Sequence, residues 1–334
     1  MMRTTQNAVT AALLVALATQ GTARPDDVTQ GVDKMQGPRW HAGLKQETPT
    51  VLPMPSGSVR ESSVIHVDGT WYMYADVVPW SSPHHPNTYD TGIHLFTSRT
   101  GADWKHRGRV LEGTPGTWDE GGTATPGAVS FAGQVWLFYS GRERRNGRGH
   151  RHIGLALATD PEGPFKKLGG PAIDGPGAKD DPCPVVSPGK DEVRLYFRRA
   201  TGTYSIDLAT TRRPRGPWEQ HGPVVEAHGD LRATESTDAK VIDGVTLLAV
   251  MEQYHSPGKG IRTVLYAARD GRAFIPCNPD CFEDVVTIRH GHRMGSHLTF
   301  HQDDTGKIKR LGVTRVLDAN GHYSRCLFDT TFAW

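Results

Sequence analysis

The first clear structural signal is Val64-Ile-His-Val-Asp-Gly69-Thr-Trp-Tyr-Met-Tyr74. Two segments rich in β-branched and aromatic residues flank Asp-Gly, a dipeptide typical of tight β-hairpin turns. The same pattern recurs with turn positions at Gly133, Asp191, Gly244 and Gly306, in steps of 64, 58, 53 and 62 residues. Self-similarity at such a period is typical of repeat folds.

A third apolar segment follows the first four hairpins. Two of the copies then close with the related motifs Gly163-Pro-Phe165 and Gly216-Pro-Trp218. Each repeat therefore has three or four short strands, and the mature chain shows no helical periodicity. We predict an all-β fold, a five-bladed β-propeller. A β-sandwich is the alternative, but the constant order of the paired segments disfavours it. The four apolar segments are residues 92–98, 153–159, 205–211 and 263–268.

The composition agrees with a soluble β-protein. Of 334 residues, 38 are Gly and 23 are Pro, which indicates many turns. Hydrophobic residues make up 37% and charged residues 22%, as in ordinary globular chains. The formal net charge is only +2, which argues against nucleic-acid binding driven by net charge.

The N-terminus resembles a secretory signal. Arg3 precedes an apolar run over residues 8–18, and the small residues Gly21 and Ala23 provide a cleavage site. The run is too short to span a bilayer, and no later segment is long enough, so we expect no membrane partner. We predict a signal peptide over 1–23, an N-terminal segment over 24–57 and one propeller domain over 58–334. The mature protein is expected to be secreted or periplasmic.

Export permits disulfide bonds among the four cysteines. Cys277 and Cys281 enclose a short loop that a bridge would close, which leaves Cys183 and Cys326 as a long bridge or as two buried thiols. All three pairings stay open at the level of sequence. A zinc site is disfavoured because the chain has no two Cys-x-x-Cys pairs.

In a propeller the first strand of each blade lines the central axis, so residues that begin these strands converge on one funnel. Three of the five begin with an acid: Glu61, Asp181 and Glu235. Clustered carboxylates suit glycoside hydrolysis, in which one carboxylic acid protonates the leaving oxygen and a second carboxylate activates water or attacks. Burial and mutual repulsion push their pKa values apart, so both roles coexist near neutral pH.

These features together resemble the five-bladed propeller glycoside hydrolases of families 43, 32, 68 and 117. The resemblance extends over nearly the whole mature chain as a repeat pattern. The segments that carry it are Glu61-Ser-Ser-Val-Ile65 with Asp68-Gly-Thr-Trp-Tyr-Met-Tyr74, Trp118-Asp119 before Thr125-Pro126, Asp181-Pro182, and Glu235 before Ile242-Asp-Gly244.

Residue by residue, the chain departs from family 43. That family usually begins blade 1 with an Asp as general base, where this chain has Glu61, and places a modulating Asp in blade 2, where this chain has Gly127. Family 117 takes its modulating Asp from blade 3. The resemblance therefore implies Glu61 as base, Asp181 as modulator and Glu235 as general acid. The adjacent acids Asp180 and Asp238 remain alternatives.

The resemblance implies no cofactor for the chemistry, but it implies calcium or another ion near the propeller axis. His297, at the start of blade 5, has three open roles: orienting a substrate hydroxyl, binding such an ion through water, or packing. No residue is assigned as a direct metal ligand.

Substrate contacts are predicted at two places. Trp118, followed by Asp119 and Glu120, offers a ring on which a sugar face stacks. Arg198 and the basic hairpin tip over residues 142–151 favour an anionic sugar, sulfated or uronic, although such a run is ordinarily a solvated face.

We therefore predict a secreted glycoside hydrolase that cleaves plant or algal oligo- or polysaccharide, with inversion if the family resemblance holds. A non-catalytic carbohydrate-binding propeller is the first alternative. A protein-interaction propeller is the second, and the acids at the strand starts disfavour it.

Overall fold

The computed structural model describes residues 57–79, 92–143, 151–173, 175–255, 261–278, 297–316 and 323–329. All regular elements within these ranges are β-strands. No helix in this part of the chain is long and apolar enough to cross a bilayer. The predicted signal peptide over 1–23 and nearly all of the segment over 24–57 lie outside the described residues.

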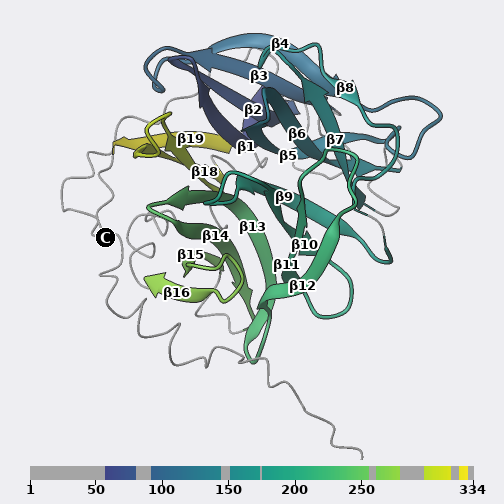
Figure 1. Cartoon of the computed structure of the whole chain (residues 1–334), viewed down its shortest axis with the longest axis vertical. Helices are drawn as coiled ribbons and strands as arrows, with labels where there is room; N and C mark the ends of the chain where they lie inside the picture. Colours follow the sequence, from purple (N-terminus) through teal and green to yellow (C-terminus); the bar gives the residue numbers. More distant parts are fainter. Residues whose placement is uncertain are drawn as a thin grey trace, which may run out of the picture.

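The strands form five antiparallel sheets, and in each sheet strands adjacent in sequence pair with each other (Figure 1). Four sheets have four strands, which we call blades 1 to 4, and the C-terminal sheet has three. Blade 1 contains β1 (Gly57–Val67), β2 (Thr70–Pro79), β3 (Gly92–Ser98) and β4 (Lys105–Glu112); blade 2 contains β5 (Gly122–Phe131), β6 (Gln134–Arg142), β7 (Arg151–Ala158) and β8 (Lys166–Lys167); blade 3 contains β9 (Lys179–Val186), β10 (Val193–Arg199), β11 (Ser205–Thr211) and β12 (Glu219–Glu226); blade 4 contains β13 (Leu231–Ile242), β14 (Val245–Tyr254), β15 (Ile261–Ala268) and β16 (Ile275–Asn278); the C-terminal sheet contains β17 (His297–Gln302), β18 (Ile308–Val316) and β19 (Tyr323–Asp329).

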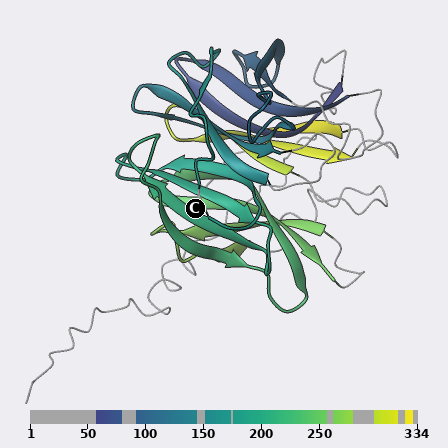
Figure 2. The ribbon, with the colours of Figure 1, turned by 90° about the vertical axis from the view of Figure 1, so that its right-hand side faces the viewer.

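The first strands of the five sheets form a closed ring. β1 contacts β5, β5 contacts β9, β9 contacts β13, β13 contacts β17, and β17 returns to β1. In the side view the yellow strands of the C-terminal sheet lie against the purple strands of blade 1 (Figure 2). The all-β propeller prediction is therefore confirmed. The predicted count of five blades is not confirmed, because the described residues form four four-stranded blades and a C-terminal sheet of three strands.

The hairpin turns follow from their sequence. Asp68 and Gly69 have φ angles of 49° and 72° and connect the paired residues Val67 and Thr70. Two consecutive positive φ angles are the mark of a type I′ turn, whose twist matches that of the flanking strands. The predicted turns at Gly133 and Gly244 have the same pair of positive angles, after Ala132 and Asp243 respectively.

Adjacent blades are held together by buried apolar clusters and by edge-on aromatic contacts. The ring of each Gly-Pro-aromatic motif packs against the blade before it, and blade 4 repeats the contact without the motif. The ring pairs are Phe165 with Tyr74 (centroids 5.6 Å apart), Trp218 with Phe138 (5.8 Å) and Phe274 with Tyr196 (5.4 Å). Such T-shaped pairs contribute about 0.5–1.5 kcal/mol beyond their buried area.

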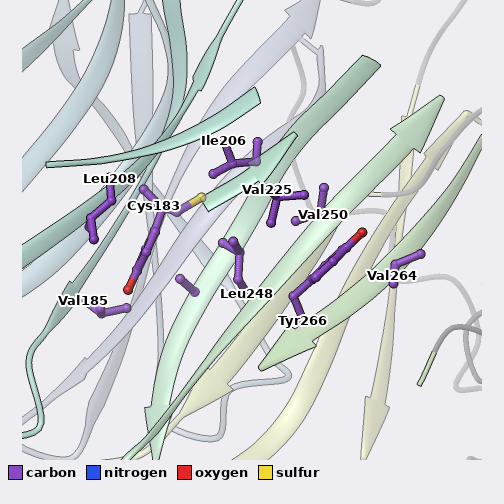
Figure 3. Packing of buried hydrophobic residues seen from close by; sticks show 11 residues of the cluster. Cys183, Val185, Ile206, Leu208, Val225, Leu248, Val250, Val264 and Tyr266 are labelled. Atoms are coloured by element: carbon purple, nitrogen blue, oxygen red, sulfur yellow. The ribbon is translucent and has the colours of Figure 1, made fainter. Parts of the chain in front are cut away.

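Cys183 belongs to the cluster between blades 3 and 4. Figure 3 shows its side chain near Ile206 of blade 3 and Leu248 of blade 4. Cys183 is a buried free thiol, and burial raises its pKa well above the usual value. All three pairings that use four cysteines are therefore excluded, including the long bridge to Cys326, and the alternative of a buried thiol holds for Cys183. The loop after Cys277, with Cys281, lies outside the described residues.

Candidate active site

The three predicted carboxylates come from the first strands of three blades: Glu61 from β1, Asp181 from β9 and Glu235 from β13. A β-bulge lies beside the first, because the register of β1 shifts between Val59 and Ser62. Asp181 has a φ angle of 52°, a left-handed conformation that is uncommon outside glycine. Bulges and unusual φ angles re-aim side chains and are frequent at functional sites.

Two of these carboxylates share one pocket. Glu61, Thr125, Asp181, Ser236 and His297 all line it, so each of the five sheets contributes one of these residues to the funnel at the strand starts. The sequence prediction that these positions converge is therefore met for Glu61, Asp181 and His297. Glu235 joins them through Arg198.

Arg198 of β10 connects the acids of blades 3 and 4. Its Nη1 lies 3.3 Å from Asp181 Oδ2 and forms a closer ion pair with Glu235 Oε1. Glu235 Oε1 also accepts a hydrogen bond from Gln253 Nε2 at 3.2 Å. Burial, followed by the nearby Asp180 charge, raises the pKa of Asp181 well above its usual value, although Arg198 opposes this shift. Arg198, predicted as a substrate contact, thus lies between two acids.

Glu61 is a buried acid of the first strand of blade 1. Its Oε1 lies 3.0 Å from Arg60 Nη1 and 3.4 Å from His297 Nε2, and its buried Oε2 has no hydrogen-bond partner. Burial raises the pKa of Glu61 well above its usual value; Arg60 opposes this shift, whereas Asp76 and Asp181 add to it. A buried carboxyl oxygen without a partner is costly in a framework and is typical of a group that meets a ligand.

Asp76 was missed at the level of sequence because it lies in the second strand, away from the strand starts. Its Oδ1 accepts the backbone N–H of Glu61 at 2.7 Å, and its Oδ2 accepts Arg60 Nη2 at 2.5 Å. Burial alone would raise its pKa, but the Arg60 guanidinium outweighs burial and holds the pKa below its usual value. Asp76 therefore fixes the backbone from which Glu61 projects.

The two alternative acids are engaged in framework contacts. Asp180 is paired with Arg151 and accepts Thr125 Oγ1 at 3.3 Å. Burial opposes ionisation of Asp180, but the Arg151 and Arg198 charges hold its pKa well below the usual value. Asp238 lies 2.9 Å from Lys240 Nζ and accepts the backbone N–H of Phe300 at 2.7 Å, which connects blade 4 to the C-terminal sheet.

Gly127 has a steric explanation. A Cβ added there would lie 2.0 Å from the carbonyl oxygen of Pro182 and 2.6 Å from Pro184 Cδ. Real Cβ atoms essentially never approach within 3.0 Å of such atoms. No side chain fits between blades 2 and 3 at this point, so the position cannot hold the modulating Asp of family 43.

Trp118, Asp119 and Glu120 are not brought to the carboxylates. Asp119 is buried and accepts Lys167 Nζ of β8, the outermost strand of blade 2, at 2.6 Å. The Trp118 ring stacks on Tyr139 with centroids 5.9 Å apart, and Glu120 is exposed in the same loop. These contacts fasten the loop before β5 to the outer part of blade 2.

His297 is neutral in this site, because burial lowers its pKa to about 4. Its contact with Glu61 Oε1 favours the role of orienting a neighbouring group. Among the described residues, no three His, Cys, Asp or Glu side chains are grouped so as to hold a metal ion. The ion near the axis therefore stays a prediction from resemblance, and no step of the chemistry is derived through it.

Comparisons with known proteins agree with this fold. The family model of glycosyl hydrolases family 43 matches residues 52–191, less than half of the chain. No curated protein matches it. Among solved structures, a family 117 glycoside hydrolase of the marine bacterium Zobellia galactanivorans is 19% identical, with a TM-score of 0.63 over 86% of this chain and 88% of that chain.

Two enzymes from Bacteroides thetaiotaomicron have the same architecture. An endo-arabinase is 12% identical with a TM-score of 0.62, over 86% of this chain and 98% of that chain. An endo-1,4-beta-xylanase is 18% identical with a TM-score of 0.61, over 84% of this chain and 95% of that chain. These likenesses show the propeller fold, and together with the family 43 match they support glycoside hydrolase activity.

Proposed function

We propose that this protein is a secreted glycoside hydrolase that cleaves glycosidic bonds of plant or algal oligo- or polysaccharide by inverting acid/base catalysis. One observation carries the proposal: Glu61 and Asp181 line one pocket, and Arg198 connects Asp181 to Glu235. Secretion is inferred from the signal-like residues 1–23. We also infer that the C-terminal sheet is the fifth blade, because β17 contacts both β13 and β1 and closes the ring.

The catalytic pair consists of Glu61 and Glu235, and the charge of Asp181 helps to raise the pKa of Glu61. Glycoside hydrolysis requires one protonated carboxyl and one ionised carboxylate. Burial favours the protonated form of Glu61, whereas Glu235 forms an ion pair with Arg198. This distribution supports Glu61 as proton donor and Glu235 as base, the reverse of the roles that the family resemblance implies.

The first test uses the purified mature protein on aryl glycosides and on plant and algal oligosaccharides. Variants Glu61→Gln and Glu235→Gln are compared with Glu112→Gln, an exposed acid of an outer strand that pairs with Arg109. We expect both site variants to lose at least about 10²-fold in kcat, the usual contribution of general acid–base catalysis, and the control to retain its activity. Unchanged activity in both site variants would refute the proposal.

Leaving-group dependence separates the two roles. A leaving group that departs without protonation makes the proton donor dispensable, so the donor variant should recover activity on dinitrophenyl glycosides. We expect this recovery for Glu61→Gln and not for Glu235→Gln. The opposite result would restore the roles that the resemblance implies. Proton NMR of the first product anomer tests inversion.

A non-catalytic carbohydrate-binding propeller is the second candidate. Two observations favour it: Gly127 excludes the blade 2 acid, and Arg198 neutralises part of the acid cluster. Glycan binding in calorimetry without hydrolysis across the panel would establish this alternative.

A further inference from the structure

Blade 2 places two arginines at the same end of the propeller as the carboxylates. Arg142 ends β6 and Arg151 begins β7, and the two residues are directly opposite each other in the strand register. Arg151 reaches Asp180, the neighbour of Asp181, and its side chain is still 34% exposed. Arg142 is buried, with 8% exposure.

This arrangement concentrates positive charge. Like charges directly opposite on neighbouring strands are destabilising. Burial, followed by repulsion from Arg60 and Arg151, lowers the pKa of Arg142. The guanidinium groups of blades 1 and 2 are therefore close enough to repel one another. Asp76 and Asp180 offset part of this repulsion, and a bound anion would reduce it further.

Two positions of blade 2, Gly127 and Asp119, place no carboxylate beside these cations. Gly127 has no room for a side chain, and Asp119 is held by Lys167 at the outer edge of the blade. Glu143, next to Arg142 in the chain, lies 3.6 Å from His152. The acids that face Arg142 come instead from Asp76 of blade 1 and Asp180 of blade 3.

We propose that Arg142 and Arg151 form a subsite for an anionic substituent of the substrate, a uronic carboxylate or a sulfate ester, beside the cleaved bond. The proposal rests on the proposed glycoside hydrolase function and names its substrate class. A guanidinium presents a planar fork of N–H donors that binds such oxyanions through two parallel hydrogen bonds. Arg151 provides the accessible contact, and Arg142 adds charge behind it.

Calorimetry on the full mature protein tests the subsite with two pairs of probes. Oligogalacturonate is compared with its carboxyl-reduced form, and a sulfated galactan oligosaccharide with its desulfated form. We expect one anionic probe to bind at least 10-fold more tightly than its uncharged partner and to lose affinity as salt is raised. The pair that shows this difference identifies the anion. Equal affinity within both pairs would overturn the proposal.

Variants of Arg151 test whether the preference for the anionic probe comes from blade 2. Arg151→Met should abolish the preference for the anionic probe. Arg151→Lys keeps a charge opposite Asp180 and so protects the fold, but it removes the fork, and we expect the preference to fall several-fold. The control is Arg212→Met, an arginine that is 72% exposed, with its partner Asp191 at the opposite end of β9. Retention of the full preference in both Arg151 variants would refute the assignment.

Hydrolysis of the same probes separates the two proposals. Anion-selective binding that requires Arg151, without any hydrolysis, would leave the subsite standing and refute the catalytic function. Equal hydrolysis of charged and uncharged probes by the wild type, lost in Glu235→Gln, would leave the catalytic function standing and overturn the subsite.

Discussion

Replacing Gly127 by Ala tests the steric reason for the missing blade 2 acid. The new Cβ would lie 2.0 Å from the Pro182 carbonyl oxygen, and this contact must lengthen by about 1 Å to reach the 3.0 Å limit of real Cβ contacts. Neither neighbour is the end of a flexible side chain, so β5 and β9 must move apart. Such overpacking costs about 1–3 kcal/mol, and two rigid neighbours place this site near 3 kcal/mol.

That cost is measurable as a lower melting temperature. With an unfolding entropy of about 2.1 cal/mol/K per residue, a domain of about 280 residues loses about 5 °C in melting temperature for a cost of about 3 kcal/mol. The displaced Pro182 follows Asp181 directly, and a shift of about 1 Å at a catalytic centre costs about 10²-fold in rate. Gly170→Ala is the matched control, because nothing lies within 4 Å of its added Cβ. A melting temperature of Gly127→Ala within about 1 °C of both the wild type and this control would contradict this steric explanation.

Three further variants test individual groups of the site. Arg198→Met leaves the Glu235 carboxylate without its cation and should cost about 3–5 kcal/mol of stability. It also removes the charge that opposes the raised pKa of Asp181, so the pH–rate profile should shift upward, and an unchanged profile would exclude Arg198 from positioning the acids. Asp238→Asn removes the charge that pairs with Lys240, so the free energy of unfolding in urea should fall by about 2 kcal/mol while kcat is retained. A loss of kcat without a loss of stability would show that Asp238 is catalytic. His297→Gln should remove part of the pH dependence of the free energy of unfolding. The pKa of histidine is near 6.5 in the unfolded chain and about 4 in buried His297. The stability present above pH 6.5 is therefore lost as the pH falls towards 4, by about 3 kcal/mol. A wild-type slope in the variant over that range would contradict the neutral ring.

The sequence determined the architecture because the fold repeats. Hairpin turns such as Asp68-Gly69 require positive φ angles that few dipeptides adopt, so their spacing reveals the repeat without tertiary information. The strand-start rule also located Glu61 and Asp181, because the first strand of each propeller blade lines the axis. Those inferences depend only on the residues in each turn and on the spacing of the repeats along the chain.

Tertiary structure decided which charged groups meet. Asp119 and Asp181 look alike in sequence, but Asp119 is paired with Lys167 at the outer edge of its blade and Asp181 faces Arg198 at the axis. Asp76 and Arg151 lie outside the first strands of their blades, and the register of those strands brings them to the site. Pairing between charges depends on distances of a few ångströms between blades, whereas turns and strand periods depend on neighbours in the chain. The sequence therefore specified the ring of blades and two of its acids. Packing between the blades specified the cations with which the acids pair and left no room for a side chain at Gly127.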